Sequence, residues 1–347
     1  MIHAAPVLTF RPLELHLAHA WTIARGTALS KKNGLLTIEC GGIVGMGEAA
    51  PNVRYGQDYH SAEAAFVKIK DACAGLDPMD TIQWIERAER VCGKDTEVVA
   101  ALDMALLDWK GKKLRIPAWK LFDVSLDASR MQKTSYSIGM DSPEMLKIKI
   151  READSFDIFK IKVGAGADEA AIAAIREITQ KTLRADANEG WKSVGEAVDK
   201  IEWLQKQGVE LIEQPLPAED APGAQAIWER VEMPIVADEA SCNITDLANC
   251  IGGYHGVNIK LSKCGGITRA LEMATAARAA GFKVMIGCMI ESSLGIAAAV
   301  QIAALFDWVD LDGNLLIKND PFVNLQMDAG RWRVPAEPGL GVALNSE

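Results

Sequence analysis

Three acidic residues stand at the ends of three successive short apolar runs. Asp186 ends the run TLRAD, Glu213 ends VELIE, and Asp238 follows PIVA. Three carboxylates with no histidine or cysteine among them are typical ligands of Mg²⁺ or Mn²⁺ and not of zinc. We expect them to hold one such ion per subunit, with open positions for a substrate carboxylate.

Two lysines flank this trio, because Lys162 ends the preceding apolar run and Lys260 ends the following one. A proton next to a carboxylate is weakly acidic, and a divalent cation stabilises the enediolate that forms when the proton leaves. Lysine acts as a base near neutral pH when burial or neighbouring positive charge lowers its pKa; the metal and Lys160 would supply that charge. With one lysine on each side, removal and return of the proton would invert the carbon.

A single charged residue at a strand end is normally a surface ion-pair partner or a helix cap, and we expect Asp141 and Asp168 to be of this kind. Five successive runs, however, each deliver a charge at the same point. Burying unpaired charges costs several kcal/mol of folding free energy. A cluster of this kind therefore indicates a function.

The elements that carry these residues repeat along the chain. The polar residues near the ends of eight apolar runs follow one another at intervals of 22 to 28 residues: Ser137, Lys162, Asp186, Glu213, Asp238, Lys260, Cys288 and Asp312. A strand, a helix and two loops take about 25 residues, and strands buried on both faces read as continuous apolar runs. The pattern predicts a parallel α/β barrel with its site at the carboxyl ends of the strands. A doubly wound sheet is less favoured, because no glycine-rich phosphate motif follows the first strand.

Before residue 134 the pattern is α+β. Val7–Leu17 and Gly34–Cys40 are strand-like, with a predicted turn at 31–34, and Ser61 is a predicted N-cap of a helix. A second helix is predicted over 97–111, and the segment 114–124 leads into a new domain.

Two helices of the barrel region have recognisable starts. Ser142 precedes Pro143, which suits the first helical position, and Ser193 forms a predicted capping box with Glu196. Gly208 follows the second of these helices as a stop signal.

Composition limits the class of protein. The chain has 347 residues, which fits a single large barrel domain with additions, and its net charge of −10 argues against nucleic acid as the main partner. No run approaches the roughly 20 apolar residues of a membrane span, and no secretory leader is evident, so we expect a cytoplasmic protein without a membrane partner. The seven cysteines are scattered and indicate neither a zinc site nor a disulfide framework. The composition is compatible with a homo-oligomer.

Five short motifs occur in order: KIK at 160–162, DAN at 186–188, EQP at 213–215, DE at 238–239 and NIKLSKCGG at 258–266. They resemble the enolase superfamily in its muconate-lactonizing subgroup, and DMALLDWKGKKLRIPAWKLF at 103–122 extends the resemblance to nearly the whole chain. The resemblance implies an α+β capping domain (1–125), a modified (β/α)7β barrel (126–315) and a C-terminal segment that returns to the cap (316–347).

The resemblance also implies chemistry. The superfamily pairs a lysine or histidine base with Mg²⁺. Mandelate racemase-like members carry that histidine after the seventh strand, whereas this chain has GCMIES at 287–292 and its five histidines lie elsewhere. The subgroup therefore implies Lys162 and Lys260 as the bases and Mg²⁺ as the cofactor, with Lys160 contacting the substrate and Asn188 and Glu239 supporting the ligands.

Members of the subgroup cycloisomerise muconates, dehydrate to o-succinylbenzoate, racemise N-succinylamino acids or epimerise dipeptides. Asp310 and Asp312 in VDLDG match the DxD pair with which dipeptide epimerases bind the free α-ammonium group. Two carboxylates beyond the metal would repel a muconate or a succinylated amine, so the pair favours a dipeptide substrate inverted at its C-terminal residue. Asp312 before Gly313 would also suit a simple turn, and an N-succinylamino acid racemase or o-succinylbenzoate synthase is the alternative.

Two cap motifs bear on which dipeptide is used. IARG at 23–26 and RYG at 54–56 resemble Ala-Glu epimerases that act on murein peptides. Arg25 would form a two-pronged pair with a substrate side-chain carboxylate, although a solvated loop arginine is the alternative. We therefore expect L-Ala-D/L-Glu epimerisation. A protein that binds Mg²⁺ and a carboxylate without catalysis is less favoured, because both lysines are present.

Overall fold

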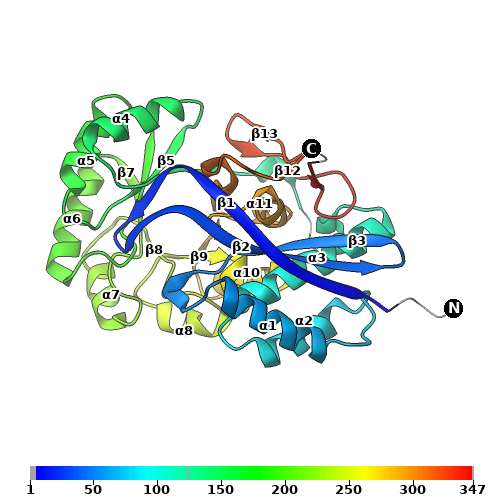
Figure 1. Cartoon of the computed structure of the whole chain (residues 1–347). Coiled ribbons are helices and arrows are strands. Elements are labelled where there is room, and N and C mark those ends of the chain that lie inside the picture. Colours follow the sequence, from blue (N-terminus) through cyan, green and yellow to red (C-terminus); the bar gives the residue numbers. More distant parts are fainter. Residues whose placement is uncertain (1–4, 123, 125, 346–347) are drawn as a thin grey trace.

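The computed structural model describes residues 5–122, 124 and 126–345. It contains a three-stranded antiparallel sheet with its own helices, which forms a cap, and an eight-stranded parallel sheet that forms a barrel (Figure 1). None of the helices in the described residues is long and apolar enough to cross a membrane.

The cap is built from strands β1 (Val7–Ile23), β2 (Gly26–Cys40) and β3 (Ile43–Ala49), followed by a short 3₁₀ turn, η1 (Val53–Tyr55). Its helices are α1 (Tyr59–Ala72), α2 (Thr81–Cys92) and α3 (Thr96–Leu114). These helices and the cap sheet share an apolar core. In Figure 1, β1 and β2 form a long blue ribbon that runs from the region of α1 and α2 to the barrel.

The predicted turn at 31–34 is wrong, because the chain continues through it as part of β2 and reverses instead at Ala24 and Arg25. Gly34 lies opposite Pro12 within the ladder, and a Cβ atom there would lie 2.0 Å from the ring of Phe10. The glycine therefore makes room for an aromatic ring and does not serve a turn.

The N-cap of α1 is Asp58 and not Ser61, which corrects the prediction by one turn of helix. The amide of Ser61 donates to Asp58 Oδ1 (2.8 Å), and the amide of Asp58 donates to Ser61 Oγ (3.0 Å). This reciprocal capping box places Ser61 at the third helical position.

Each of the eight predicted runs contains a strand of the barrel: β4 (Tyr136–Ile138), β5 (Ile158–Lys162), β6 (Thr182–Asp186), β7 (Val209–Glu213), β8 (Ile235–Ala237), β9 (Gly256–Lys260), β10 (Lys283–Gly287) and β11 (Trp308–Asp310). The strands pair in chain order and run parallel. A bridge between Thr134 and Val309 joins the segment before β4 to β11, so the ring closes.

Helices alternate with these strands: α4 (Pro143–Glu152), α5 (Asp168–Arg176), α6 (Val194–Lys206), α7 (Ala221–Trp228), α8 (Leu247–Cys250), α9 (Leu261–Cys264), α10 (Ile267–Ala279) and α11 (Ser293–Val300). The predicted (β/α)7β class is therefore confirmed. Ser142 caps α4 with Pro143 at its start. Ser193 caps α6, but the carboxylate of Glu196 accepts from the amide of Lys192, so the predicted capping box is only half formed.

The C-terminal segment runs back to the cap. It contains η6 (Gly313–Leu316) and the short strands β12 (Phe322–Val323), β13 (Met327–Asp328), β14 (Arg331–Trp332) and β15 (Ala343–Leu344). Ile317 bridges Leu17 of β1, and Gly339 bridges Pro117. The limits of the three parts at residues 125 and 315 stay a prediction.

Candidate active site

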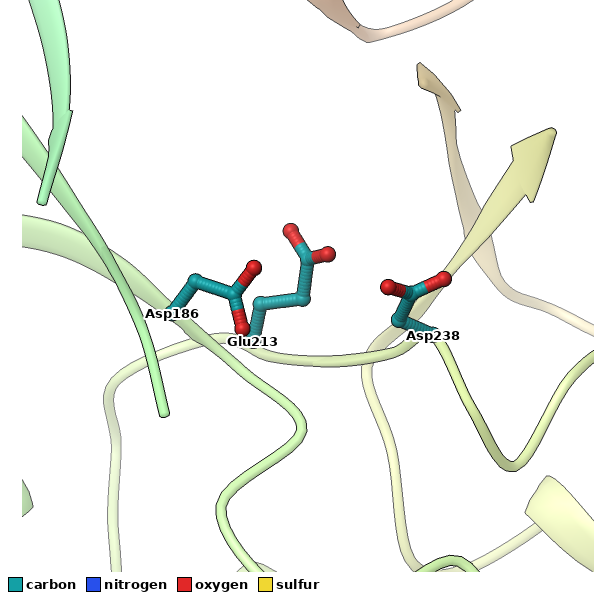
Figure 2. A group of neighbouring side chains, drawn as sticks. All are labelled: Asp186, Glu213 and Asp238. Carbon is teal, nitrogen blue, oxygen red and sulfur yellow. The ribbon is translucent and has the colours of Figure 1, made fainter. Parts of the chain in front are cut away.

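The three predicted metal ligands meet at the carboxyl ends of adjacent barrel strands. Asp186 ends β6, Glu213 ends β7 and Asp238 follows β8, and Figure 2 shows their carboxylate groups gathered together. One oxygen from each lies within 4.8 Å of the others, and the residues are 0, 0 and 2% exposed. Three converging, buried oxygen donors suit a hard divalent cation such as Mg²⁺.

Backbone and side-chain amides aim these carboxylates. The amide of Asn188 donates to Asp186 Oδ1 (2.9 Å), and Asn258 Nδ2 donates to Glu213 Oε1 (3.0 Å). Gln214, in a left-handed conformation (φ +37°), accepts the amide of Asp238 at its Oε1 atom (3.0 Å). Sequence reasoning assigned no role to Asn258 or Gln214, although both lie within the quoted motifs.

The two predicted bases approach the triad from different strands. Lys162 Nζ, at the end of β5, lies 2.6 Å from Asp186 Oδ2, and Lys260 Nζ, at the end of β9, lies 2.8 Å from Asp238 Oδ2. Because β5 and β9 stand on the two sides of β6, β7 and β8, the lysines contact opposite flanks of the triad. They do not contact the same carboxylate.

Two further lysines complete the charged cluster. Lys160 Nζ lies 2.8 Å from Glu213 Oε2, 3.2 Å from Asp186 Oδ2 and 2.7 Å from Asp310 Oδ2. Lys263 Nζ lies 2.6 Å from Asp238 Oδ1 and donates to two backbone carbonyls. Lys263 was not predicted, and its only signal was its place in the NIKLSKCGG motif.

These ammonium groups set the ionisation of the cluster. Burial would raise the pKa of Asp186 and Asp238, but Lys162 and Lys160 lower the first and Lys260 and Lys263 lower the second. Burial and the charge of Asp186 raise the pKa of Glu213 to about 8. The protein therefore balances its buried acidic ligands with a surrounding set of cations.

Asp310 ends β11, and Asp312 follows two residues later, before η6. Asp310 accepts hydrogen bonds from Ser135 Oγ (2.5 Å) and Lys160 Nζ (2.7 Å), and Asp312 Oδ2 accepts the amide of Ser137 (2.5 Å). Burial and the charge of Asp310 raise the pKa of Asp312 to about 7. Both aspartates line the same cavity as the catalytic candidates, and the Lys160–Asp310 pair was not anticipated.

Arg25 is neither free for a ligand nor simply solvated. Its Nη2 lies 2.8 Å from Glu239 Oε1, its Nη1 lies 3.1 Å from Glu189 Oε2, and Nη1 also donates to the carbonyl of Asn188 (3.0 Å). Asn188 Nδ2 donates to Glu239 Oε1 (3.4 Å). The hairpin tip of the cap is thus tied to the loops after β6 and β8.

A cavity of about 240 Å³ lies between the cap and the barrel mouth. Cap residues such as Trp21 and Tyr55 line one side, and the candidate lysines and Asp310 line the other. Residues 146–347 match the family model described as enolase C-terminal domain-like, and residues 9–122 match the N-terminal domain of mandelate racemase/muconate lactonizing enzyme.

The chain belongs to the mandelate racemase/muconate lactonizing enzyme family.

Several epimerases are similar to this protein over nearly its whole length. An L-Ala-D/L-amino acid epimerase of Pedosphaera parvula is 37% identical, over 98% of this chain and 99% of its own. An L-Ala-D/L-Glu epimerase of Bacteroides thetaiotaomicron is 36% identical, over 96% of this chain and 87% of its own. The crystal structure of an Enterococcus faecalis V583 dipeptide epimerase with Mg and L-Leu-L-Tyr has a TM-score of 0.91 at 30% identity, covering 98% of this chain and 99% of its own.

The predicted resemblance to the enolase superfamily is therefore confirmed. The named relatives are epimerases, so the chain is an isomerase of the racemase and epimerase class, as predicted. The position that carries the histidine of mandelate racemase-like members holds Cys288 to Ser292 here and supplies no histidine.

Proposed function

We propose that this protein is a Mg²⁺-dependent dipeptide epimerase that inverts the α-carbon of the C-terminal residue. The observation that carries the proposal is the buried triad with Lys162 and Lys260 on its two flanks, beneath a cavity whose floor also holds Asp310 and Asp312. The named relatives, which include dipeptide epimerases, support the same assignment.

The residues of the triad fit a divalent cation. Asp186, Glu213 and Asp238 offer only carboxylate oxygens. The side-chain amide of Asn258 donates to Glu213 Oε1 and so holds the Glu213 carboxylate in place. A hard, small cation prefers this donor set, which favours Mg²⁺. When bound, the cation supplies Lewis-acid stabilisation of negative charge that develops on the substrate carboxylate.

Lys162 and Lys260 then act as a pair of bases. The lysine on one face takes the α-proton, and the lysine on the other face returns a proton to the opposite side, which inverts the carbon. Lys162 pairs with Asp186 (2.6 Å) and Lys260 pairs with Asp238 (2.8 Å). Each lysine is therefore held on its own side of the triad. Fixed donors on both faces reduce the reorganisation that proton transfer requires.

The dipeptide is a zwitterion, and the cavity offers a place for each charge. Its carboxylate would face the triad, and its ammonium group would face Asp310 and Asp312, which line the same cavity. One observation favours the alternative of an N-succinylamino acid racemase or o-succinylbenzoate synthase. Lys160 already pairs with Asp310 (2.7 Å) and so reduces the negative charge there.

Among dipeptides, we infer L-Ala-D/L-Glu, with a role in murein peptide metabolism. The similarity to a Bacteroides thetaiotaomicron L-Ala-D/L-Glu epimerase supports this choice. Arg25 would bind the glutamate side chain only by exchanging Glu189 or Glu239 for it, because both already pair with its guanidinium group.

Proton exchange in D₂O tests the proposal. The protein is incubated with Mg²⁺ and either L-Ala-L-Glu, other dipeptides or N-succinylamino acids, and NMR follows deuterium at the α-carbon. Deuterium and inversion at the C-terminal residue of dipeptides support the epimerase. Exchange confined to the succinylated amino acids would indicate an N-succinylamino acid racemase instead, and no exchange with any of these compounds would refute both the epimerase and the racemase. Calorimetric titration with Mg²⁺, in wild type and in Glu213→Gln, tests the metal site without turnover; equal affinities would refute it.

A further inference from the structure

Five cationic side chains line the cavity, and four of them are matched by carboxylates: Arg25, Lys160, Lys162 and Lys260. Lys31 is different. Within the described part of the chain its ammonium group has neither a hydrogen bond nor an ion pair, yet the residue is partly buried in the cavity wall. One cation of this cavity thus lacks an anionic partner.

The strand register explains why Lys31 faces the cavity. Lys31 pairs with Leu15 of β1, whose side chain is fully buried, and paired residues project from the same face of a sheet. Asn33, two residues further on the same face, donates to the carbonyl of Ile290 in the barrel (3.0 Å). Lys32, between them, points the other way and lies over the ring of Tyr59 at 4.6 Å. Lys31 is therefore directed at the barrel mouth by the pleat of β2.

The surroundings of Lys31 leave its charge uncompensated. Burial lowers the pKa of Lys31, and no neighbouring carboxylate offsets this effect. Removing an ammonium group from water without a counterion costs free energy, which an incoming anion would recover. Arg25 is the opposite case, because Glu239 pairs with its guanidinium group and Glu189, which it shares with Arg54, contacts it as well.

We propose that Lys31 binds a carboxylate on a side chain of the substrate and so selects dipeptides that contain an acidic residue. The inference rests on the proposed dipeptide epimerase function and assigns the third charge of the substrate. The triad takes the terminal carboxylate, Asp310 and Asp312 take the ammonium group, and Lys31 takes the side-chain carboxylate. Arg25 serves instead as part of the cavity wall.

Matched substrates and matched variants test this role. We measure kcat/KM for L-Ala-L-Glu, its neutral isostere L-Ala-L-Gln, and the reversed dipeptide L-Glu-L-Ala. Lys31→Met keeps most of the length of the side chain and removes its charge, and Lys32→Met is the control on the opposite face of the same strand. Losing a charge-assisted hydrogen bond is expected to lower kcat/KM for the acidic dipeptide roughly tenfold to hundredfold. The value for L-Ala-L-Gln should change less than about threefold, because it lacks the charge. The two acidic dipeptides show which residue carries the carboxylate.

Equilibrium binding separates failure of this inference from failure of the proposed function. Calorimetry with the same dipeptides needs no turnover. An acidic-over-neutral preference that is present in wild type, lost in Lys31→Met and kept in Lys32→Met supports Lys31, even in a protein that epimerises none of these dipeptides. A wild type without that preference, or a Lys31→Met variant that retains it, overturns the inference while leaving dipeptide epimerisation intact.

Discussion

Arg54 and Glu189 form a two-pronged ion pair between the cap and the barrel. Arg54 Nε lies 2.6 Å from Glu189 Oε2, and Arg54 Nη2 lies 2.7 Å from Glu189 Oε1. The same carboxylate accepts Arg25 Nη1 (3.1 Å) and the amide of Ala218 (2.9 Å). One side chain after β6 therefore holds two cap loops and the loop after β7, and these segments border the cavity.

Glu189→Gln should loosen this closure. The variant keeps the shape of the side chain but loses the charge shared by Arg25 and Arg54, and a hydrogen bond to a charged group contributes about 1.5–3 kcal/mol. We expect KM for the dipeptide to rise roughly tenfold with a smaller change in kcat, measured by steady-state kinetics. Glu219→Gln is the control, because Glu219 also pairs with Arg54 (3.1 Å) but is 75% exposed and should contribute little. Equal effects of the two variants would contradict the clamp.

The barrel and its charged cluster could be predicted from sequence because both follow from a local pattern. Continuous apolar runs at a regular interval predict parallel strands, and a charge at the end of each run must then face the barrel mouth. Asp186, Glu213 and Asp238 are brought together in this way, with Lys162 and Lys260 beside them. Nothing beyond the order of the strands was needed.

The rest depends on contacts between distant segments. Arg25 pairs with Glu189 and Glu239, which come from barrel loops more than 160 residues away in the sequence. No spacing rule links these loops to the cap hairpin. Gly34 is a turn signal in the sequence, whereas its actual role is to admit the ring of Phe10. Lys263 lies in a four-residue helix, where spacing does not fix the direction of a side chain.

Removing one base should leave the other working. In Lys162→Ala and Lys260→Ala we expect epimerisation to fall by about 10²–10⁴, the usual contribution of a general base. Each variant should still exchange the α-proton of one epimer with D₂O, and the two variants should act on opposite epimers. NMR of each epimer, incubated separately, measures this. Lys283→Met is the control, because Lys283 begins β10 at the far end of the barrel. Exchange of the same epimer by both variants would refute the two-sided arrangement.

Glu97 predicts how stability depends on pH. It is fully buried in the first turn of α3, and neither carboxyl oxygen has a hydrogen bond to another residue in the described part of the chain. Burial raises its pKa from 4.5 to about 8. The folded protein therefore holds this proton over a pH range in which the unfolded chain has lost it, so rising pH between these values destabilises the fold.

Glu97→Gln removes this penalty. Relative to wild type, the free energy of unfolding of the variant should increase between pH 5 and pH 8, by at most about 1.4 kcal/mol per pH unit. Urea unfolding of both proteins at several pH values measures the difference. Glu86→Gln, at a half-exposed position on α2, is the control and should show no trend. Parallel curves for wild type and Glu97→Gln would show that Glu97 is not protonated in the fold.

Asp312 tests where the substrate ammonium group binds. Asp312→Asn can still accept the amide of Ser137 through its side-chain oxygen, so the variant removes the charge and keeps the local fold. We compare kcat/KM for L-Ala-L-Glu and for N-acetyl-L-Ala-L-Glu, which lacks the ammonium group. Wild type should prefer the free amine, and Asp312→Asn should lose roughly tenfold or more of that preference, as expected for one charged hydrogen bond. Asp328→Asn, on the exposed strand β13, should retain it. If Asp312→Asn lowers kcat/KM equally for both substrates, Asp312 supports the barrel end and does not bind the amine, and the choice of a dipeptide over a succinylated amino acid loses its main structural support.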